Sequence, residues 1–212
     1  VAFVPVTGPG RSAAETAAAV AHAVRGRGLC VRVTASDLVT LNPSATLANF
    51  ITGTGVPPDS VDIVLDTGAT YGMQMAVVRS HSLDLLRHLP APAAWRSVVL
   101  IGSAFPPTMA AVPTHGHILV PRTEWAVWKL LHSRRATLPR MPNFGDYGIQ
   151  HPNLPEGFDP RFMQVAPSIR YAGPDEWIIL KGQSTKVSGA AVQYPLLATK
   201  LMGMPEYCGS GH

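Results

Sequence analysis

Short apolar runs alternate with helical patterns over residues 1–132. Runs rich in Val, Ile and Leu predict five strands, at 1–6, 29–34, 61–66, 97–101 and 118–120. Periodic segments after four of these runs predict helices at 13–25, 45–51, 73–89 and 124–134. Ser12 and Glu15 have the spacing of a capping box at the start of the first helix. Apolar strands joined by helices indicate an α/β fold, with a parallel sheet that is covered on both faces.

The pattern changes in the last third of the chain. Residues 143–150 are expected to be extended, with glycines placed for bends. Segments 167–171 and 176–180, separated by the turn residues 173–175, predict a hairpin or two neighbouring strands. Residues 192–202 predict a closing helix.

We expect one domain over residues 1–212, with all strands in one sheet, as in a β/α barrel that lacks its first strands. A content of 46% hydrophobic and 14% charged residues is sufficient for a core and excludes intrinsic disorder. No apolar stretch reaches the roughly 18 residues of a membrane span, so no membrane partner is expected.

The remaining composition bears on location and completeness. Two cysteines are too few for a disulfide framework, which favours a cytoplasmic protein. The chain starts at Val1, without an initiator Met or a signal peptide, which favours a fragment of a longer protein.

The net charge of +4 is a weak indication of nucleic-acid binding, because Lys and Arg are scattered along the chain. The densest basic stretch contains Arg134, Arg135 and Arg140. Cations are favoured at a helix C-terminus, and binding of an anionic ligand is the alternative interpretation.

Charged residues interrupt or end several apolar strands. Arg32 lies within the second strand and Asp66 ends the third. Arg170 and Lys181 lie in the two later strands or at their end, and Arg122 follows the fifth strand. Because ligands bind at the carboxyl ends of parallel strands, these groups are candidates for one site. An internal network of salt bridges is the alternative interpretation.

The segment FGDYGIQHP, residues 144–152, has the highest density of functional groups. Asp146 and His151 are candidate general acids or bases, and Tyr147 and Gln150 could orient a substrate. A turn in which Asp146 bonds to its own backbone is the alternative.

Two weaker signals do not lead to a site. His115 and His117 offer two metal ligands without a third nearby, so no metal is expected. Residues 7–10 resemble a phosphate-binding turn but lack the complete glycine-rich motif. No cofactor is assigned.

The segments FGDYGIQHP and IRYAGPDEWIILKG, together with VDIVLDTGA, WRSVVLIGSAFP and PRTEWAVWKLL, resemble the beta-protein family of phages and bacteria. The resemblance extends from Val1 to about Tyr207. It implies a TIM-barrel-like fold, a phage- or defence-associated setting, and a longer protein of which this chain is the C-terminal two thirds. It implies no particular activity.

The favoured hypothesis is a barrel mouth that binds an anionic, phosphate-bearing ligand. The residues expected to contact the ligand are Arg32, Arg122, Tyr147, Gln150, Arg170, Tyr171 and Lys181. Asp66, Asp146 and His151 are expected to carry any proton transfer or metal chemistry. The alternative is a non-enzymatic interaction protein of a phage or mobile-element system, with a protein partner, in which the charged strand ends are salt bridges.

Overall fold

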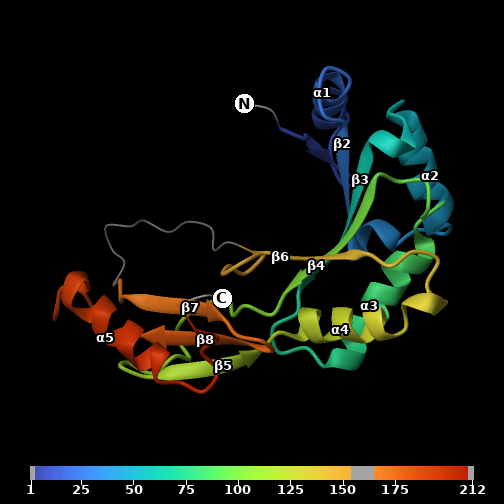
Figure 1. Ribbon diagram of the computed structural model, residues 1–212. Coiled ribbons are helices and arrows are strands. Elements are labelled where there is room, and N and C mark those ends of the chain that lie inside the picture. The colour runs from blue at the N-terminus through green and yellow to red at the C-terminus, as the bar shows by residue number, and fades with distance from the viewer. Residues whose placement is uncertain (1–2, 154–164, 210–212) are drawn as a thin grey trace.

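A computed structural model describes residues 3–153 and 165–209 of the protein, which contain two separate sheets (Figure 1). The first sheet is parallel and contains, in spatial order, β1 (Val6–Thr7), β2 (Leu29–Thr34), β3 (Val61–Ala69), β4 (Ser97–Ser103) and β6 (Asn143–Asp146). The second sheet is antiparallel and contains β5 (His117–Pro121), β8 (Glu176–Lys181) and β7 (Ser168–Ala172). The helices are α1 (Ala13–Ala23), α2 (Pro43–Gly53), α3 (Met75–His88), α4 (Thr123–Ser133) and α5 (Ala190–Met202).

The starts of the first two helices follow from their capping residues. The Ser12 hydroxyl accepts a hydrogen bond from the Glu15 backbone N–H at 3.2 Å, and the Glu15 carboxylate accepts one from the Ser12 N–H at 2.9 Å. The predicted capping box is therefore confirmed. Helix α2 begins two residues earlier than predicted, because Asn42 caps it and Pro43 suits the first helical turn.

The strand order of the parallel sheet advances without reversal. Right-handed crossovers that always advance in one direction place their helices on one face of a sheet. One apolar cluster accordingly joins the strands to helices α1–α4; its members include Val31, Ile63, Leu100, Ala19, Leu47, Leu85 and Val127. The alternate positions Arg32, Val64 and Val99 lie on the opposite face and are partly exposed. The structure thus differs from the expectation that both faces are covered.

Strand β5 does not belong to the parallel sheet. It pairs antiparallel with β8, and β6 takes the place next to β4. The apolar cluster of Phe105, Val112, Val120, Trp177 and Ile179 holds this arrangement together. A short apolar run has the same pattern in a parallel and in an antiparallel sheet. Which sheet β5 joins is therefore decided by the strand with which it pairs. The expectation of one sheet is wrong, and neither sheet closes into a barrel within the described residues.

The predicted hairpin is confirmed as β7 and β8, closed by a hydrogen bond from the Gly173 N–H to the Glu176 carbonyl at 2.8 Å. Strand β8 is buried on both faces. Trp177 and Ile179 face the cluster around Phe105, whereas Ile178 and Leu180 pack against helix α5. Figure 1 shows this hairpin sheet with α5 on one side of the molecule and the parallel sheet with its helices on the other.

Truncation of a buried side chain on β8, the central strand of the antiparallel sheet, is expected to destabilise the protein strongly. The variant Ile179→Ala should lower the free energy of unfolding by roughly 2–5 kcal/mol, because it leaves a cavity at a fully buried position. The matched variant Leu119→Ala on neighbouring β5 removes a partly exposed side chain and should cost less, about 1 kcal/mol. Urea denaturation of both variants measures this, and equal losses would contradict the assignment of β8 as the core strand.

Candidate functional site

Three side chains from distant segments meet at the carboxyl edge of the parallel sheet. Arg32 lies on β2, Asp66 on β3, and Tyr147 follows β6. The Arg32 Nε donates to Asp66 Oδ2 at 2.6 Å, and Arg32 Nη2 donates to the Tyr147 hydroxyl at 2.7 Å. The Tyr147 hydroxyl in turn donates to the same carboxylate oxygen of Asp66. The three groups form a closed ring of hydrogen bonds.

The members of this ring differ in exposure. The Asp66 side chain is 0% exposed, whereas that of Arg32 is 41% exposed. Burial, followed by the hydrogen bond to Asp66, raises the pKa of the Tyr147 hydroxyl. Tyr147 therefore stays protonated at neutral pH and acts as a donor to Asp66. The chemical result is a guanidinium group that is fixed on one side and open to solvent on the other.

A second ion pair joins the parallel sheet to the hairpin. Arg122 Nη2 donates to Asp146 Oδ2 at 3.3 Å, and Arg122 Nη1 donates to the Gly173 carbonyl at 3.2 Å. The guanidinium carbon lies 4.9 Å from the centre of the Trp177 ring. The Arg122 side chain is only 12% exposed, so this arginine holds two sheets together and is poorly available to a ligand.

The two aspartates share a local geometry that follows from the sequence Asp-x-Gly. Asp66 Oδ1 accepts the Gly68 N–H at 2.7 Å, and Asp146 Oδ1 accepts the Gly148 N–H at 2.8 Å. Both glycines have positive φ angles, 71° and 61°, which residues with a side chain adopt rarely. The turn predicted as the alternative for Asp146 is thus present. In each aspartate the backbone orients one oxygen, and the other faces an arginine.

Glu124 is a buried carboxyl group that the sequence analysis did not single out. It is 5% exposed, and its Oε2 accepts hydrogen bonds from the Ala104 N–H at 3.0 Å and the Thr70 hydroxyl at 3.4 Å. Its Oε1 has no partner among the described residues. Burial raises the pKa of this carboxyl group. An acidic residue in the first turn of a helix is ordinarily solvent-exposed, so the sequence contained no signal for this position.

Two backbone carbonyls of the FGDYGIQHP segment connect the loop after β6 to β4 and β7. The Gln150 carbonyl accepts from the Ser103 hydroxyl at 3.0 Å, and Arg170 Nη1 donates to the Ile149 carbonyl at 2.9 Å. The ring of His151 accepts from the Asn153 N–H at 3.1 Å. Arg170 thus positions this loop against the hairpin, and His151 has no hydrogen bond or ion pair with Asp66 or Asp146.

Two further candidates lie away from the ring of Arg32, Asp66 and Tyr147. Lys181 Nζ donates to the Met109 carbonyl at 3.0 Å, and the Tyr171 hydroxyl accepts from the Cys208 N–H at 3.0 Å. Both residues belong to the antiparallel sheet, and neither has a hydrogen bond to Arg32, Asp66 or Tyr147.

Residues 3–153 and 165–209 contain no cluster of three or more His, Cys, Asp or Glu side chains arranged to hold a metal ion. Over the same ranges, every helix is too short or too polar to cross a bilayer.

A parallel sheet with helices on one face and an ordered arginine at its carboxyl edge defines an α/β protein with a candidate ligand site at the usual position for this class. The model of the Beta protein family matches residues 1–212, and the chain belongs to this family. Searches of the curated proteins and of the solved structures find no significant match.

Arg32 and Asp66 are expected to be strongly coupled in their effects on the free energy of unfolding. In a double-mutant cycle of Arg32→Gln and Asp66→Asn, the two changes should couple by about 1–3 kcal/mol in unfolding free energy, because Asp66 is buried. The exposed pair of Arg87 and Asp84, 3.5 Å apart, is the control and should couple by about 0.5 kcal/mol or less. Urea denaturation measures both cycles, and similar coupling in the two pairs would contradict a buried ring.

The buried carboxyl group of Glu124 should make stability depend on pH. Its folded-state pKa lies above the ordinary value of 4.5, so its contribution to stability is greatest below pH 4.5 and is lost as the pH rises through the folded-state pKa. Relative to the native protein, the variant Glu124→Gln should therefore gain stability as the pH rises from 4 to 7.

The variant Glu15→Gln provides a control of opposite sign for this measurement. The hydrogen bonds from Ser12 lower the pKa of Glu15, so that its contribution is present above pH 4.5 and lost as the pH falls. Thermal unfolding between about pH 3 and pH 7 compares the three proteins, and the Glu15→Gln difference is expected below pH 4.5. Parallel curves for the native protein and Glu124→Gln would show that Glu124 is not titrated above its ordinary range.

Proposed function

We propose that the carboxyl edge of the parallel sheet binds a small anionic ligand that carries a phosphate group, with Arg32 as its main contact. The observation that carries this proposal is the asymmetric environment of Arg32. Its Nε and Nη2 are held by Asp66 and Tyr147, and its Nη1 has no hydrogen-bond partner among the described residues. A guanidinium that is already oriented loses less conformational freedom on binding and offers directed donors to a phosphate.

The turn after β1 supports the same location. Thr7 pairs with Val31, the residue before Arg32, so the turn lies beside Arg32 at the same edge. A Cβ atom added to Gly8 would lie 2.3 Å from the Arg32 carbonyl oxygen, so the backbone approaches this closely only because residue 8 is glycine. The backbone of this turn therefore lies directly against that of Arg32 at the carboxyl edge.

The balance of charges at the carboxyl edge determines how an anion would be recognised there. Asp66 compensates Arg32 and Asp146 compensates Arg122, so the edge has little excess positive charge. Binding in this proposal depends on directed hydrogen bonds more than on long-range attraction. Asp66 and Tyr147 act as positioning residues, and Arg122 and Arg170 hold the surrounding segments. The contacts of Lys181, Tyr171 and His151 give them no part in this proposal.

The fold and setting expected from the resemblance are part of the proposal. The unreversed strand order supports a barrel-like arrangement of the parallel strands. The cytoplasmic location and the phage- or defence-associated setting are predictions that no observation of the structure supports further.

A second candidate function is that of a non-enzymatic interaction protein. The observation in its favour is that Asp66 is completely enclosed and accepts from Arg32, Tyr147 and Gly68, as expected of a purely structural ion pair. In that case Arg32 stabilises the sheet and a protein partner, rather than a small anion, carries the function.

Binding measurements distinguish the two candidates. Thermal shift and calorimetry with inorganic phosphate, nucleotides and phosphosugars should find a ligand that stabilises the native protein. Arg32→Gln should weaken its binding about tenfold or more, through loss of charge-assisted hydrogen bonds. The control is Arg96→Gln, because Arg96 forms a comparable pair with Asp62, 2.5 Å apart, at the amino end of β3.

Retention of ligand binding by Arg96→Gln together with its loss in Arg32→Gln is the expected pattern. If no anion of the panel stabilises the native protein, while Arg32 and Asp66 couple strongly in stability, the interaction protein replaces the proposed function.

A further inference from the structure

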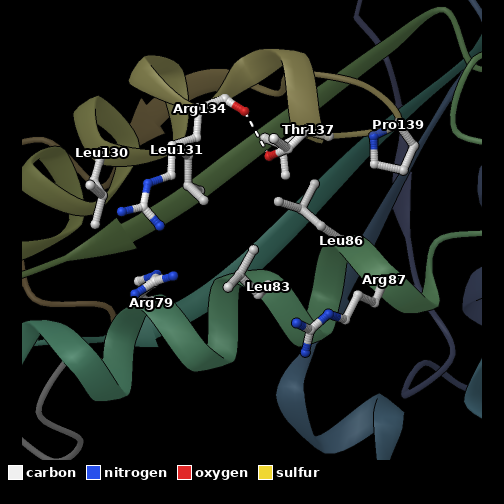
Figure 2. A pocket seen from close by; sticks show the side chains of 10 residues that line it. Arg79, Leu83, Leu86, Arg87, Leu130, Leu131, Arg134, Thr137 and Pro139 are labelled. Atoms are coloured by element: carbon white, nitrogen blue, oxygen red, sulfur yellow. Dashed lines mark hydrogen bonds between the residues drawn. The ribbon is translucent and has the colours of Figure 1, made fainter.

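A pocket of about 280 Å³ lies between helices α3 and α4, on the helix layer and away from the carboxyl edge (Figure 2). Its lining residues come from α3 between Arg79 and Arg87, from the end of α4 and from the segment that follows α4. None of them contacts Arg32, Asp66 or Tyr147 through a hydrogen bond or an ion pair. The pocket is therefore a feature separate from the site of the proposed function.

The floor of the pocket is made of leucine side chains. These are Leu83, Leu86, Leu130, Leu131 and Leu138. Leu86 and Leu131 are buried members of the main core, and Leu83 and Leu138 pack against it. Because these residues are fixed by the core, the apolar floor is part of the folded structure and does not have to be formed when a ligand binds.

Three arginines line the pocket, and Arg87 is the one that pairs with a carboxylate, Asp84 at 3.5 Å, among the described residues. Figure 2 shows the guanidinium groups of Arg79, on α3, and Arg134, at the end of α4, directed toward the same gap between the two helices. Among the described residues, neither side chain has an ion-pair or hydrogen-bond partner. Two like charges across a gap repel each other, and an acidic group between them would remove this repulsion.

The structure separates the three arginines of the basic stretch found in the sequence. Arg140 donates to the carbonyls of Pro92 and Trp95, at 3.0 and 2.6 Å, and Arg135 donates to the His132 carbonyl at 3.3 Å. These two arginines are engaged with backbone groups. Only Arg134 turns to the pocket, where its charge is available to a ligand.

We propose that this pocket binds a small amphiphile that has one acidic headgroup, a carboxylate or a phosphate, on a short aliphatic chain. The headgroup would lie between Arg79 and Arg134 and the chain over the leucine floor. The volume is at the lower end of ligand pockets, which favours a short chain. A membrane surface is a poorer match, because the leucines are recessed between helices and do not project as an apolar helix face would.

Titration with octanoate and octyl phosphate, each below its critical micelle concentration, tests the proposal by methyl NMR of the intact protein. The methyl signals of Leu83 and Leu130 should shift in a saturable manner. Lengthening the chain by one methylene should strengthen binding about three- to fourfold until the pocket is filled. Acetate, inorganic phosphate and octanol test the headgroup and the chain separately, and each should bind at least tenfold more weakly.

Arginine variants test the role of the rim. Arg79→Gln and Arg134→Gln should each weaken octanoate binding about five- to tenfold. Arg135→Gln is the matched control, because Arg135 lies beside Arg134 but does not line the pocket, and it should leave the affinity within about twofold. These positions are exposed or half-buried, so the variants are expected to fold.

Several outcomes would overturn the proposal. Binding of octanol as tight as that of octanoate would show that the arginines do not recognise a headgroup, and equal binding of inorganic phosphate would show an anion site without a chain. Absence of shifts with both amphiphiles at millimolar concentration would reject the ligand class. Shifts of the same leucine methyls by an acidic, leucine-containing peptide alone would assign the pocket to a protein partner. Each result is independent of Arg32, whose variant should bind octanoate normally.

Discussion

The packing of one helix layer on a parallel sheet with an unreversed strand order is the constraint on which the other features depend. Because every crossover advances in the same direction, helices α1–α4 cover the same face, and one apolar cluster joins them to the strands. No helix of residues 3–153 and 165–209 belongs to an apolar cluster on the opposite face of this sheet. That face can therefore accommodate Arg32 and Asp66 on neighbouring strands, positions that two helix layers would have made apolar.

The aspartates at the carboxyl edge of the sheet, Asp66 on the open face and Asp146 on the helix side, are oriented by hydrogen bonds from the backbone. In both Asp-x-Gly turns, a glycine N–H at positive φ orients the aspartate, so that its second oxygen is directed to an arginine. The arginines of the two ion pairs, Arg32 with Asp66 and Arg122 with Asp146, differ in their exposure to solvent. Arg122 is enclosed by aromatic rings and joins the two sheets, whereas Arg32 keeps access to solvent. Exposure, and not residue type, separates an arginine that can contact a ligand from one that is structural.

The same distinction applies on the helix layer. Arg140 and Arg135 satisfy backbone carbonyls, while Arg134 faces Arg79 above a leucine floor. The two sites that we propose each contain an arginine that is open to solvent, and they differ in chemistry. The carboxyl edge offers directed donors in a charge-compensated setting, and the pocket offers uncompensated charge beside apolar surface. In our proposals the two sites therefore bind different anions, a polar phosphate compound at the edge and an amphiphile at the pocket.

The sequence by itself determined the local structure of this protein: the capping box at Ser12, the apolar strand 29–34, the hairpin around Gly173 and the turn at Asp146. Each depends on residues a few positions apart, whose conformational preferences are visible in the sequence. Only the tertiary structure decided that β5 joins the hairpin, that Glu124 is buried, and that Arg32 meets Asp66 and Tyr147 while Lys181 does not. Arg32 is 34 residues from Asp66 and 115 from Tyr147, and such distant pairs form when strands choose their neighbours by burying apolar surface across the whole chain.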